Sequence, residues 1–197
     1  MDYAATHPDA IITYRKSDMI LDGDSDASYL SKRGARSRAG GHFFMSSNTP
    51  VPPNNGAVLT IAQLIKAVMS SAAEAEIGVL FINAQEAAPA RKTLQEMGHS
   101  QGRTLIQTDN TTSFGVVNSN IQPRKTKAMD VRWHWLRCRY SQGQFRYFWQ
   151  PGPTNKGDYT TKHHCAAHHQ NERPTFLTPV EIVQSLRAKQ NKKPHVF

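Results

Sequence analysis

Cysteines and long apolar runs are scarce in this sequence. Its 197 residues include two cysteines, Cys138 and Cys165, so at most one disulfide bond can form. Both thiols are expected to be free in a reducing compartment. No apolar stretch approaches the roughly 18 residues that a membrane-spanning helix requires. The N-terminal segment MDYAATHPDA has neither the basic nor the apolar region of a secretion signal. We therefore expect an intracellular chain, not a membrane protein, and no redox chemistry.

Acidic side chains are outnumbered by basic ones. There are 15 Asp and Glu against 24 Lys and Arg, which gives a formal net charge of +9. The surplus is uneven, because residues 1–120 hold 10 basic and 11 acidic side chains, whereas residues 121–197 hold 14 and 4. A basic surplus favours an anionic partner, of which nucleic acid is the commonest. The length fits one domain with its own core.

The first half of the chain predicts antiparallel strands followed by a helix. A basic turn separates the segments 19–31 and 42–47, which is typical of a hairpin, and further short strands are expected at 57–63 and 66–71. From residue 72 the composition becomes rich in Ala, Glu and Leu, with an apolar stripe at helical spacing formed by Ala73, Ile77, Leu80 and Ala84. Pro89 is expected to end or kink this helix.

The second half predicts further strands and helices in alternation. A strand is expected at 104–108 and an aromatic strand at 144–150. Between them lies a helix with an apolar stripe formed by Met129, Trp133, Leu136 and Tyr140. A short helix near Asp158 is expected to precede a weakly structured tail. The order β-β-β-α-β-α-β-α predicts an α/β fold in which one sheet carries helices on its faces.

Four acidic side chains are expected at the ends of these elements, namely Asp26, Glu74, Asp109 and Asp158. Carboxylates that converge at one edge of a sheet need cations between them, and hard oxygen ligands favour Mg²⁺ or Mn²⁺. Two such ions about 3.5–4 Å apart activate a water and stabilise the leaving oxygen in phosphodiester hydrolysis. The acids therefore predict a site with two metal ions that hydrolyses nucleic acid.

Six blocks along nearly the whole chain follow a known pattern in order. They are DSDASYLS (24–31), RSRAGGHFFMS (36–46), SSAAEAE (70–76), QTDN (107–110), RKTKAMDVRWHWLR (124–137) and TNKGDYTTK (154–162). Together they resemble the ribonuclease H domain of copia-type long-terminal-repeat retrotransposon polyproteins. The corresponding blocks of that family read SDADWAGD, RSTSGYVFFL, SSTEAEY, a strand ending in CDN, RTKHIDIRYHFIR and N-x-A-D-x-L-T-K. Residues 3–9 resemble the linker that leaves the reverse transcriptase.

The resemblance implies a ribonuclease H-like fold, a mixed five-stranded sheet with helices on both faces. It also implies an endoribonuclease that hydrolyses the RNA strand of RNA/DNA hybrids with two Mg²⁺ or Mn²⁺ ions. Carried over by position, the catalytic and metal-binding residues are Asp26, Glu74, Asp109 and Asp158, with Asp24 and Glu76 as near neighbours. In this assignment Asp26 bridges the ions, Glu74 and Asp109 complete one side, and Asp158 supports the second ion.

Two departures and two alternative functions qualify this resemblance. Ser28 replaces the second acid of the family's DAD triplet, and Ala128 replaces the His of its KHID block. A non-catalytic, domesticated nucleic-acid-binding module with the same fold is one alternative, and a DNA-directed nuclease or integrase-like core is another. We expect a linker at 1–18, the ribonuclease H domain at 19–165 and a basic polar tail at 166–197. The chain is expected to be a monomer, with a reverse transcriptase as a further partner.

Some of the acids also have structural interpretations. Ser71 and Glu74 have the spacing of a capping box, in which the Glu side chain returns to the amide at the helix start. Asp109 and Asp158 also suit helix caps or partners of a helix dipole. The alternation of Asp22, Asp24 and Asp26 resembles a calcium loop, but Ala27 and Arg33 stand where that loop needs Gly and Glu.

Nucleic-acid contacts are expected from basic, polar and aromatic side chains on the hairpin turn and the second long helix. They are Lys32, Arg33, Arg36, Arg38, Asn110, Lys127, Arg132, Trp135 and Arg139. A solvated turn and an exposed helix face without function are the alternatives. The His163, His164, Cys165, His168 and His169 cluster has ligand types that bind zinc. Its spacing does not fit paired ligands on separate elements, so a solvated tail is favoured.

Overall fold

The computed structural model describes residues 5–7, 10–118, 127–179 and 181–185, and for residues 127–130 it describes the backbone alone. Two compact units are formed, one by Ser17–His163 and the other by Met1–Lys16 with His164–Phe197. The larger unit contains β1 (Ile20–Lys32), β2 (Arg36–Ser46), β3 (Ala57–Leu64), α2 (Ala72–Glu96), β4 (Thr104–Thr108), α3 (Thr111–Val117), α4 (Lys127–Ser141), β5 (Phe145–Trp149), a 3-10 turn (Gly152–Thr154) and α5 (Asp158–Thr161).

The five strands form one mixed sheet in the order β3-β2-β1-β4-β5. Strands β1, β2 and β3 pair antiparallel with one another, whereas β4 pairs parallel with both β1 and β5. The connection from β3 to β4 runs through α2, as a parallel pairing requires. The pairing of β1 with β4 is short, with Gly23 opposite Ile106 and Asp24 opposite Gln107, so β1 continues for eight residues after its last partner in β4. The mixed five-stranded sheet predicted from the sequence is confirmed.

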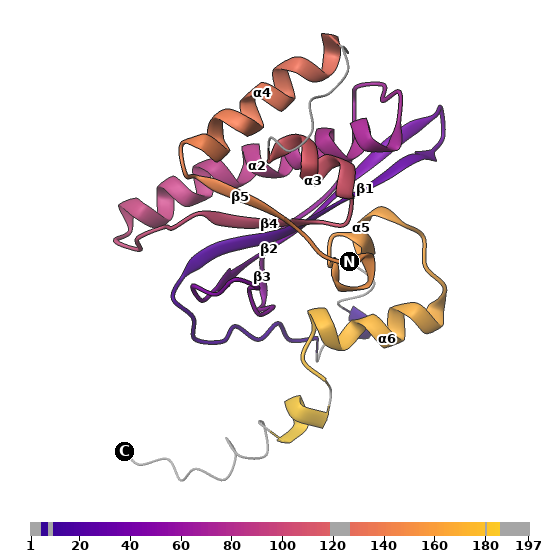
Figure 1. The fold of residues 1–197 in the computed structure, drawn as a ribbon. Helices are drawn as coiled ribbons and strands as arrows, with labels where there is room; N and C mark the ends of the chain where they lie inside the picture. Colours follow the sequence, from indigo (N-terminus) through magenta and orange to yellow (C-terminus); the bar gives the residue numbers. More distant parts are fainter. Residues whose placement is uncertain (1–4, 8–9, 119–126, 180, 186–197) are drawn as a thin grey trace. The chain divides into compact units, whose positions relative to one another are not determined.

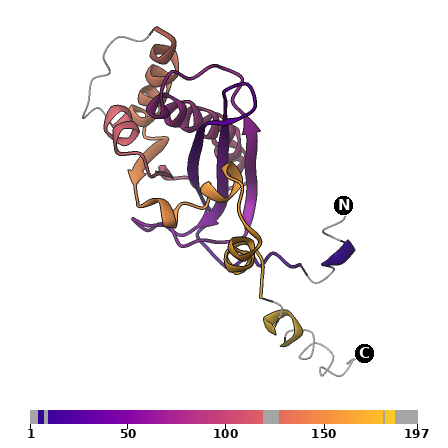
Figure 2. The ribbon, with the colours of Figure 1, turned by 90° about the vertical axis from the view of Figure 1, so that its right-hand side faces the viewer.

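One face of the sheet is covered by α2 and α4, which lie together in Figures 1 and 2. The rings of Phe81 in α2 and Trp135 in α4 meet edge to face, with 5.3 Å between their centroids. Beneath these helices lies the apolar core, whose most buried members are Leu21, Phe43, Ile77, Leu80, Ile106, Leu136, Phe145 and Tyr147. The predicted apolar stripe of α2 therefore faces the sheet, since its residues Ile77, Leu80 and Ala84 are buried in this core.

The two neighbouring glycines of β2 show that helices cover both faces. A Cβ at Gly41 would lie 2.5 Å from the side-chain oxygen of Asn83 in α2. A Cβ at Gly40 would lie 2.5 Å from the carbonyl oxygen of Gly157, directly before α5, and from a methyl carbon of Thr161. Because successive residues of a strand point to opposite faces, α2 and α5 lie on opposite faces of the sheet. Only glycine allows both elements to approach β2 this closely.

Besides the start of β2 at Arg36, six residues earlier than expected, the larger unit differs from the predicted elements at Pro89, at residues 66–71 and at α3. Pro89 lies inside α2 without ending it, because Ala87 and Leu94 on either side are buried in the core and hold the helix to the sheet. The expected strand at 66–71 is absent, since Ile65 and Met69 pack against Val79 in a second apolar cluster instead of pairing with a strand. The helix α3 was not predicted.

The smaller unit brings the two ends of the chain together. The amide of Thr178 donates to the carbonyl of Ile11 at 2.7 Å, and the side chains of Thr13 and Thr178 are hydrogen-bonded. Helix α6 (Ala166–Phe176) forms where a weakly structured tail was expected. The domain boundaries given above remain predictions. Among the described residues, no helix combines the length and the apolar character needed to cross a membrane.

Candidate metal centre

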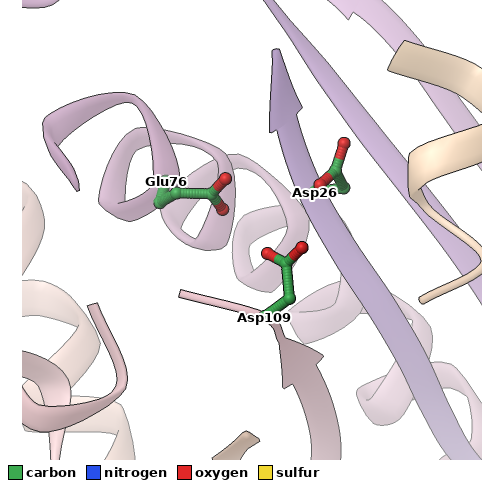
Figure 3. A group of neighbouring side chains, drawn as sticks. All are labelled: Asp26, Glu76 and Asp109. Atoms are coloured by element: carbon green, nitrogen blue, oxygen red, sulfur yellow. The ribbon is translucent and has the colours of Figure 1, made fainter. Parts of the chain in front are cut away.

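Three carboxylates converge where β1 runs past the end of β4. Asp26 lies two residues beyond Asp24, the last residue of β1 that pairs with β4, and Asp109 directly follows β4. In parallel strands these positions are level with each other. Glu76 reaches the same point from the second turn of α2. Figure 3 shows the three side chains converging, and one oxygen of each lies within 4.8 Å of the others.

Burial makes this group unfavourable as a set of bare anions. Asp26 is 2% exposed and Glu76 is 7% exposed. Burial, followed by repulsion from Asp26 and Asp109, raises the pKa of Glu76 to about 9. Burial likewise raises the pKa of Asp26 to about 6, with Asp158 and Asp109 adding to the effect and a hydrogen bond from Thr161 opposing it. The nearby charge of Lys162 lowers the pKa of both acids but does not offset their burial.

Each buried acid is held by a hydrogen bond that leaves other oxygens available. The hydroxyl of Thr161 in α5 donates to Oδ2 of Asp26. The amide of Ala27 donates to Oε1 of Glu76 at 3.3 Å, and Oε2 of Glu76 is buried without a partner among the described residues. The two hydrogen bonds fix the directions of the Asp26 and Glu76 side chains, and they leave Oε2 of Glu76 as a buried acceptor.

Asp158 lies beside the three carboxylates without joining them. It is the first residue of α5, its carboxylate is paired with Lys162, and its side chain is 25% exposed. Its charge raises the pKa of Asp26, which shows that the two carboxylates are electrostatically coupled. Of the four acids expected from the sequence, the structure thus brings Asp26 and Asp109 together and places Asp158 next to them.

Glu74 does not reach the metal centre, and this corrects the sequence assignment. Its Oε2 accepts from the amide of Ser70 at 2.7 Å and from the hydroxyl of the same residue. Its own amide donates to the hydroxyl of Ser71, the N-cap of α2, at 3.1 Å. The Ser71 hydroxyl therefore caps the helix, and the Glu74 side chain binds the residue before the N-cap instead of the N-cap amide of a capping box. Glu76 points to another side of α2, because residues two positions apart in a helix differ by about 200° around its axis.

A signal for Glu76 was present in the sequence. Asn83 follows Glu76 by seven residues, and side chains seven apart share one helix face. In the structure Asn83 is fully buried, and its amide donates to the hydroxyl of Ser25 in β1 at 2.7 Å. A polar residue at this spacing inside an otherwise apolar face indicates the side of α2 that meets β1.

The other acids of β1 accept hydrogen bonds from backbone amides. Asp22 accepts from the amide of Leu105 at 2.8 Å, and Asp24 accepts from the amide of Lys156 at 3.1 Å. Burial raises the pKa of both to about 7. These two acids stand on the same face of β1 as Asp26, but neither belongs to the group of three.

The residues expected to contact nucleic acid lie in three regions, the hairpin turn, the start of α3 and α4. At the hairpin turn Arg33 and Arg36 are exposed, Lys32 and Arg38 are half-buried, and Nζ of Lys32 lies 2.8 Å from Nε2 of His163. Asn110 caps α3 by accepting from the amide of Ser113. The side chain of Lys127 lies outside the described residues.

The predicted binding face of α4 is largely used for packing. Trp135 packs against Phe81 on one side, and the guanidinium of Arg139 lies over its ring at 5.0 Å. Arg139 also donates to Gln144, and Arg132 lies 3.7 Å from the sulfur of Met69. The indole of Trp135 is thus partly covered by these two side chains, and its contact with a sugar-phosphate backbone stays a prediction.

The His/Cys segment does not form a group of metal ligands. The rings of His164 and His168 are stacked with 4.1 Å between their centroids, and Cys165 is the exposed N-cap of α6. Within the part of the chain that the structure describes, Asp26, Glu76 and Asp109 are the only group of three or more such side chains close enough to hold a metal ion.

Comparison with known proteins gives one relative by sequence. No protein-family model matches the chain. The retrovirus-related Pol polyprotein from transposon TNT 1-94 of Nicotiana tabacum is 29% identical over 121 residues. The resemblance to copia-type retrotransposon polyproteins is confirmed. The match covers 61% of this chain but 9% of the polyprotein, so the chain corresponds to a small part of that relative.

Solved structures of ribonucleases H are also similar. The N-terminal RNase H domain of a Mycobacterium tuberculosis protein gives a TM-score of 0.48 with 12% identity, covering 72% of this chain and 87% of that one. LC11-RNase H1 in complex with RNA/DNA hybrid gives 0.47 with 10% identity, covering 71% and 92%. The strand order, the pairings and the helices on both faces described above are those of a ribonuclease H-like fold, as predicted from the sequence.

Proposed function

We propose that this protein is a metal-dependent endoribonuclease that hydrolyses the RNA strand of RNA/DNA hybrids. The observation that carries the proposal is the convergence of Asp26, Glu76 and Asp109 within 4.8 Å, at the point where β1 of a ribonuclease H-like sheet runs past the end of β4. The ordered sequence blocks and the copia-type relative support the same function.

The chemistry of the donor set fits hard divalent cations. All three side chains offer carboxylate oxygens, the ligands that Mg²⁺ and Mn²⁺ prefer. The raised pKa of Glu76 and its buried, unpartnered Oε2 are the features that a bound cation would relieve. We therefore assign the two metal ions to Asp26, Glu76 and Asp109, with Asp158 alongside. When bound, such ions activate a water and stabilise the developing charge on the leaving oxygen.

The protein's own residues position this chemistry. Thr161 fixes one oxygen of Asp26, so the other is directed to the centre. Ala27 fixes Glu76 in the same way. Asp158 and Lys162 form an ion pair at the rim, where a phosphodiester approaches from solvent. The exposed Arg33 and Arg36 lie on the hairpin that continues β1 and offer contacts to phosphates. Hybrid preference is assigned to backbone shape and 2′-hydroxyl contacts.

A cleavage assay tests the proposal. Labelled RNA/DNA hybrid, duplex DNA, duplex RNA and single-stranded RNA are incubated with the protein in Mg²⁺, Mn²⁺, Ca²⁺ or a chelator. We expect cleavage of the RNA in the hybrid with Mg²⁺ or Mn²⁺ only, because Ca²⁺ prefers larger and looser shells. Binding of the hybrid without cleavage under all conditions would identify a non-catalytic module. Preferential cutting of duplex DNA would identify an integrase-like nuclease.

A further inference from the structure

Trp149 is an exposed aromatic residue beside the metal centre. It ends β5 and is 44% exposed, whereas Phe145 and Tyr147 on the same strand are buried at 0% and 1%. Within the described residues of the unit Ser17–His163, no other Phe, Tyr or Trp is classed as exposed. The indole therefore keeps an open apolar face that a ligand can reach.

The ring is tied to the residue that supplies one of the three carboxylates. The indole N–H of Trp149 donates to the backbone carbonyl of Asp109 at 2.9 Å, and Trp149 is the register partner of Thr108 at the end of β4. The turn that follows is also packed on this residue, since a Cβ at Gly152 would lie 3.0 Å from Oδ2 of Asp109. The exposed face is thus presented in a fixed direction next to the site.

The other two tryptophans have different surroundings. The indole N–H of Trp133 donates to the carbonyl of Val116 at 3.0 Å, and the guanidinium of Arg137 lies 4.8 Å from the centre of its ring. Trp135 packs against Phe81 between α4 and α2. Both are only partly exposed and belong to the packing of the helices. Trp149 alone offers an open indole face near the carboxylates.

We propose that Trp149 contacts the substrate by packing its exposed indole face against a base or sugar of the strand next to the phosphodiester at the metal centre. This inference rests on the function proposed above. A nucleic acid is a polyanion, and it approaches a site formed by carboxylates, so an uncharged contact there attracts the strand without adding negative charge. Stacking of a base on an aromatic side chain contributes about 1–3 kcal/mol and tolerates every base, because each has a flat π face.

The test separates binding from cleavage by using the Asp26→Asn background, which is expected to bind hybrid without cutting it. Acrylamide quenching of tryptophan fluorescence is measured with and without RNA/DNA hybrid. We expect hybrid to protect one accessible indole, and we expect this protected component to be missing when Trp149→Phe is added. Trp135→Phe serves as the matched control, because its ring is packed between helices and the protected component should remain.

Kinetics supply the second readout. In the otherwise unchanged protein, Trp149→Ala should raise KM for the hybrid about 5- to 100-fold with a smaller effect on kcat, whereas Trp149→Phe should retain most of the affinity. Melting curves of both variants check the fold, and Trp149→Leu replaces the alanine variant if the latter is unstable. Unchanged KM together with an unprotected indole would overturn the inference. Protection of Trp149 in a protein that never cleaves hybrid would support the contact while the proposed nuclease activity fails.

Discussion

Two parts of β1 carry acids on the same face and give them different surroundings. Asp22 and Asp24 lie where β1 runs beside β4, and each accepts a backbone hydrogen bond, from Leu105 and Lys156. Asp26 lies past the end of β4, where Glu76 and Asp109 meet it. All three are buried, and burial raises the pKa of each. Neither burial nor a raised pKa therefore distinguishes Asp26 from Asp22 and Asp24. What distinguishes Asp26 is its position past the end of the neighbouring strand β4, where Glu76 and Asp109 can approach it.

The largest expected effect is on catalysis, and it contrasts Asp26 with Asp24. Asp26→Asn should lower turnover on hybrid by roughly 10³-fold, because it removes a ligand charge from the metal centre. The turnover of Asp24→Asn should stay within about 10-fold of that of the unchanged protein. The asparagine oxygen can still accept from Lys156, and Asp24 is not one of the three converging carboxylates. Steady-state cleavage rates measure both. Equal losses of turnover in the two variants would show that Asp24 and Asp26 do not differ in their role in catalysis.

The next effect concerns stability and pH, and it involves Asp22. Its folded pKa is raised from 3.8 to about 7, mainly by burial. Well below pH 3.8 the group is neutral in both states and causes no penalty, whereas above pH 7 the folded state must hold a disfavoured charge. Asp22→Asn should therefore be more stable than the unchanged protein at pH 8 by roughly 2–4 kcal/mol, and equally stable at about pH 3.

Denaturant unfolding at several pH values measures this effect. The asparagine oxygen can still accept from Leu105, so loss of that hydrogen bond does not complicate the comparison. The attraction between Asp22 and Arg91 lowers the pKa of Asp22, so the net rise to about 7 already includes it. A variant that is less stable at pH 8 would show that the ionised carboxylate is a stabilising partner, contrary to the account.

The two parts of β1 should also differ in how their variants respond to a metal ion, measured as thermal stability. Mn²⁺ at 100 times its dissociation constant should stabilise the protein by about 2.7 kcal/mol, because it binds the folded state and not the unfolded chain. The rise in Tm should persist in Asp24→Asn and disappear in Asp26→Asn. A rise that survives in Asp26→Asn would place the metal elsewhere. This measurement does not depend on cleavage.

The smallest effect concerns the basic hairpin that continues β1 beyond Asp26. Replacing the exposed Arg33 and Arg36 by alanine should reduce the slope of log K against log salt by about two, as expected for two lost phosphate contacts. Replacing Arg132 and Arg139 should change it by less than about one, because Arg139 lies over Trp135 and Arg132 is directed to Met69. The reverse order would place the substrate on α4.

The strands β3 and β4 could be predicted from the sequence because both are short and clearly bounded. The strand expected at 104–108 is β4 itself, and the strand expected at 57–63 is β3 with one more residue. Local pattern was insufficient where tertiary packing decides. Pro89 disrupts a helix by itself, but the buried residues on both sides of it hold α2 continuous. The segment at 66–71 has strand-like composition but no strand to pair with.

Two of the three converging carboxylates were among the acids predicted from the sequence. Asp109 directly follows β4, Asp26 lies in β1 level with it, and the resemblance pointed to both. The choice between Glu74 and Glu76 depends on which side of α2 faces β1, and a block match that contains both glutamates does not fix that rotation. The packing of Trp135 against Phe81 was not foreseen for a related reason, since helical spacing gives a face but not what covers it.

The pair Glu76→Gln and Glu74→Gln tests the central claim most directly, because the two residues are two positions apart and chemically identical. Hybrid cleavage and the Mn²⁺-induced rise in Tm are measured for both. The account predicts that Glu76→Gln loses cleavage by roughly 10³-fold and loses the metal response. It predicts that Glu74→Gln keeps both, with a loss of about 1 kcal/mol in unfolding free energy from its weakened hydrogen bonds with Ser70. Full cleavage by Glu76→Gln, or its loss in a folded Glu74→Gln, would contradict the assignment of the metal centre.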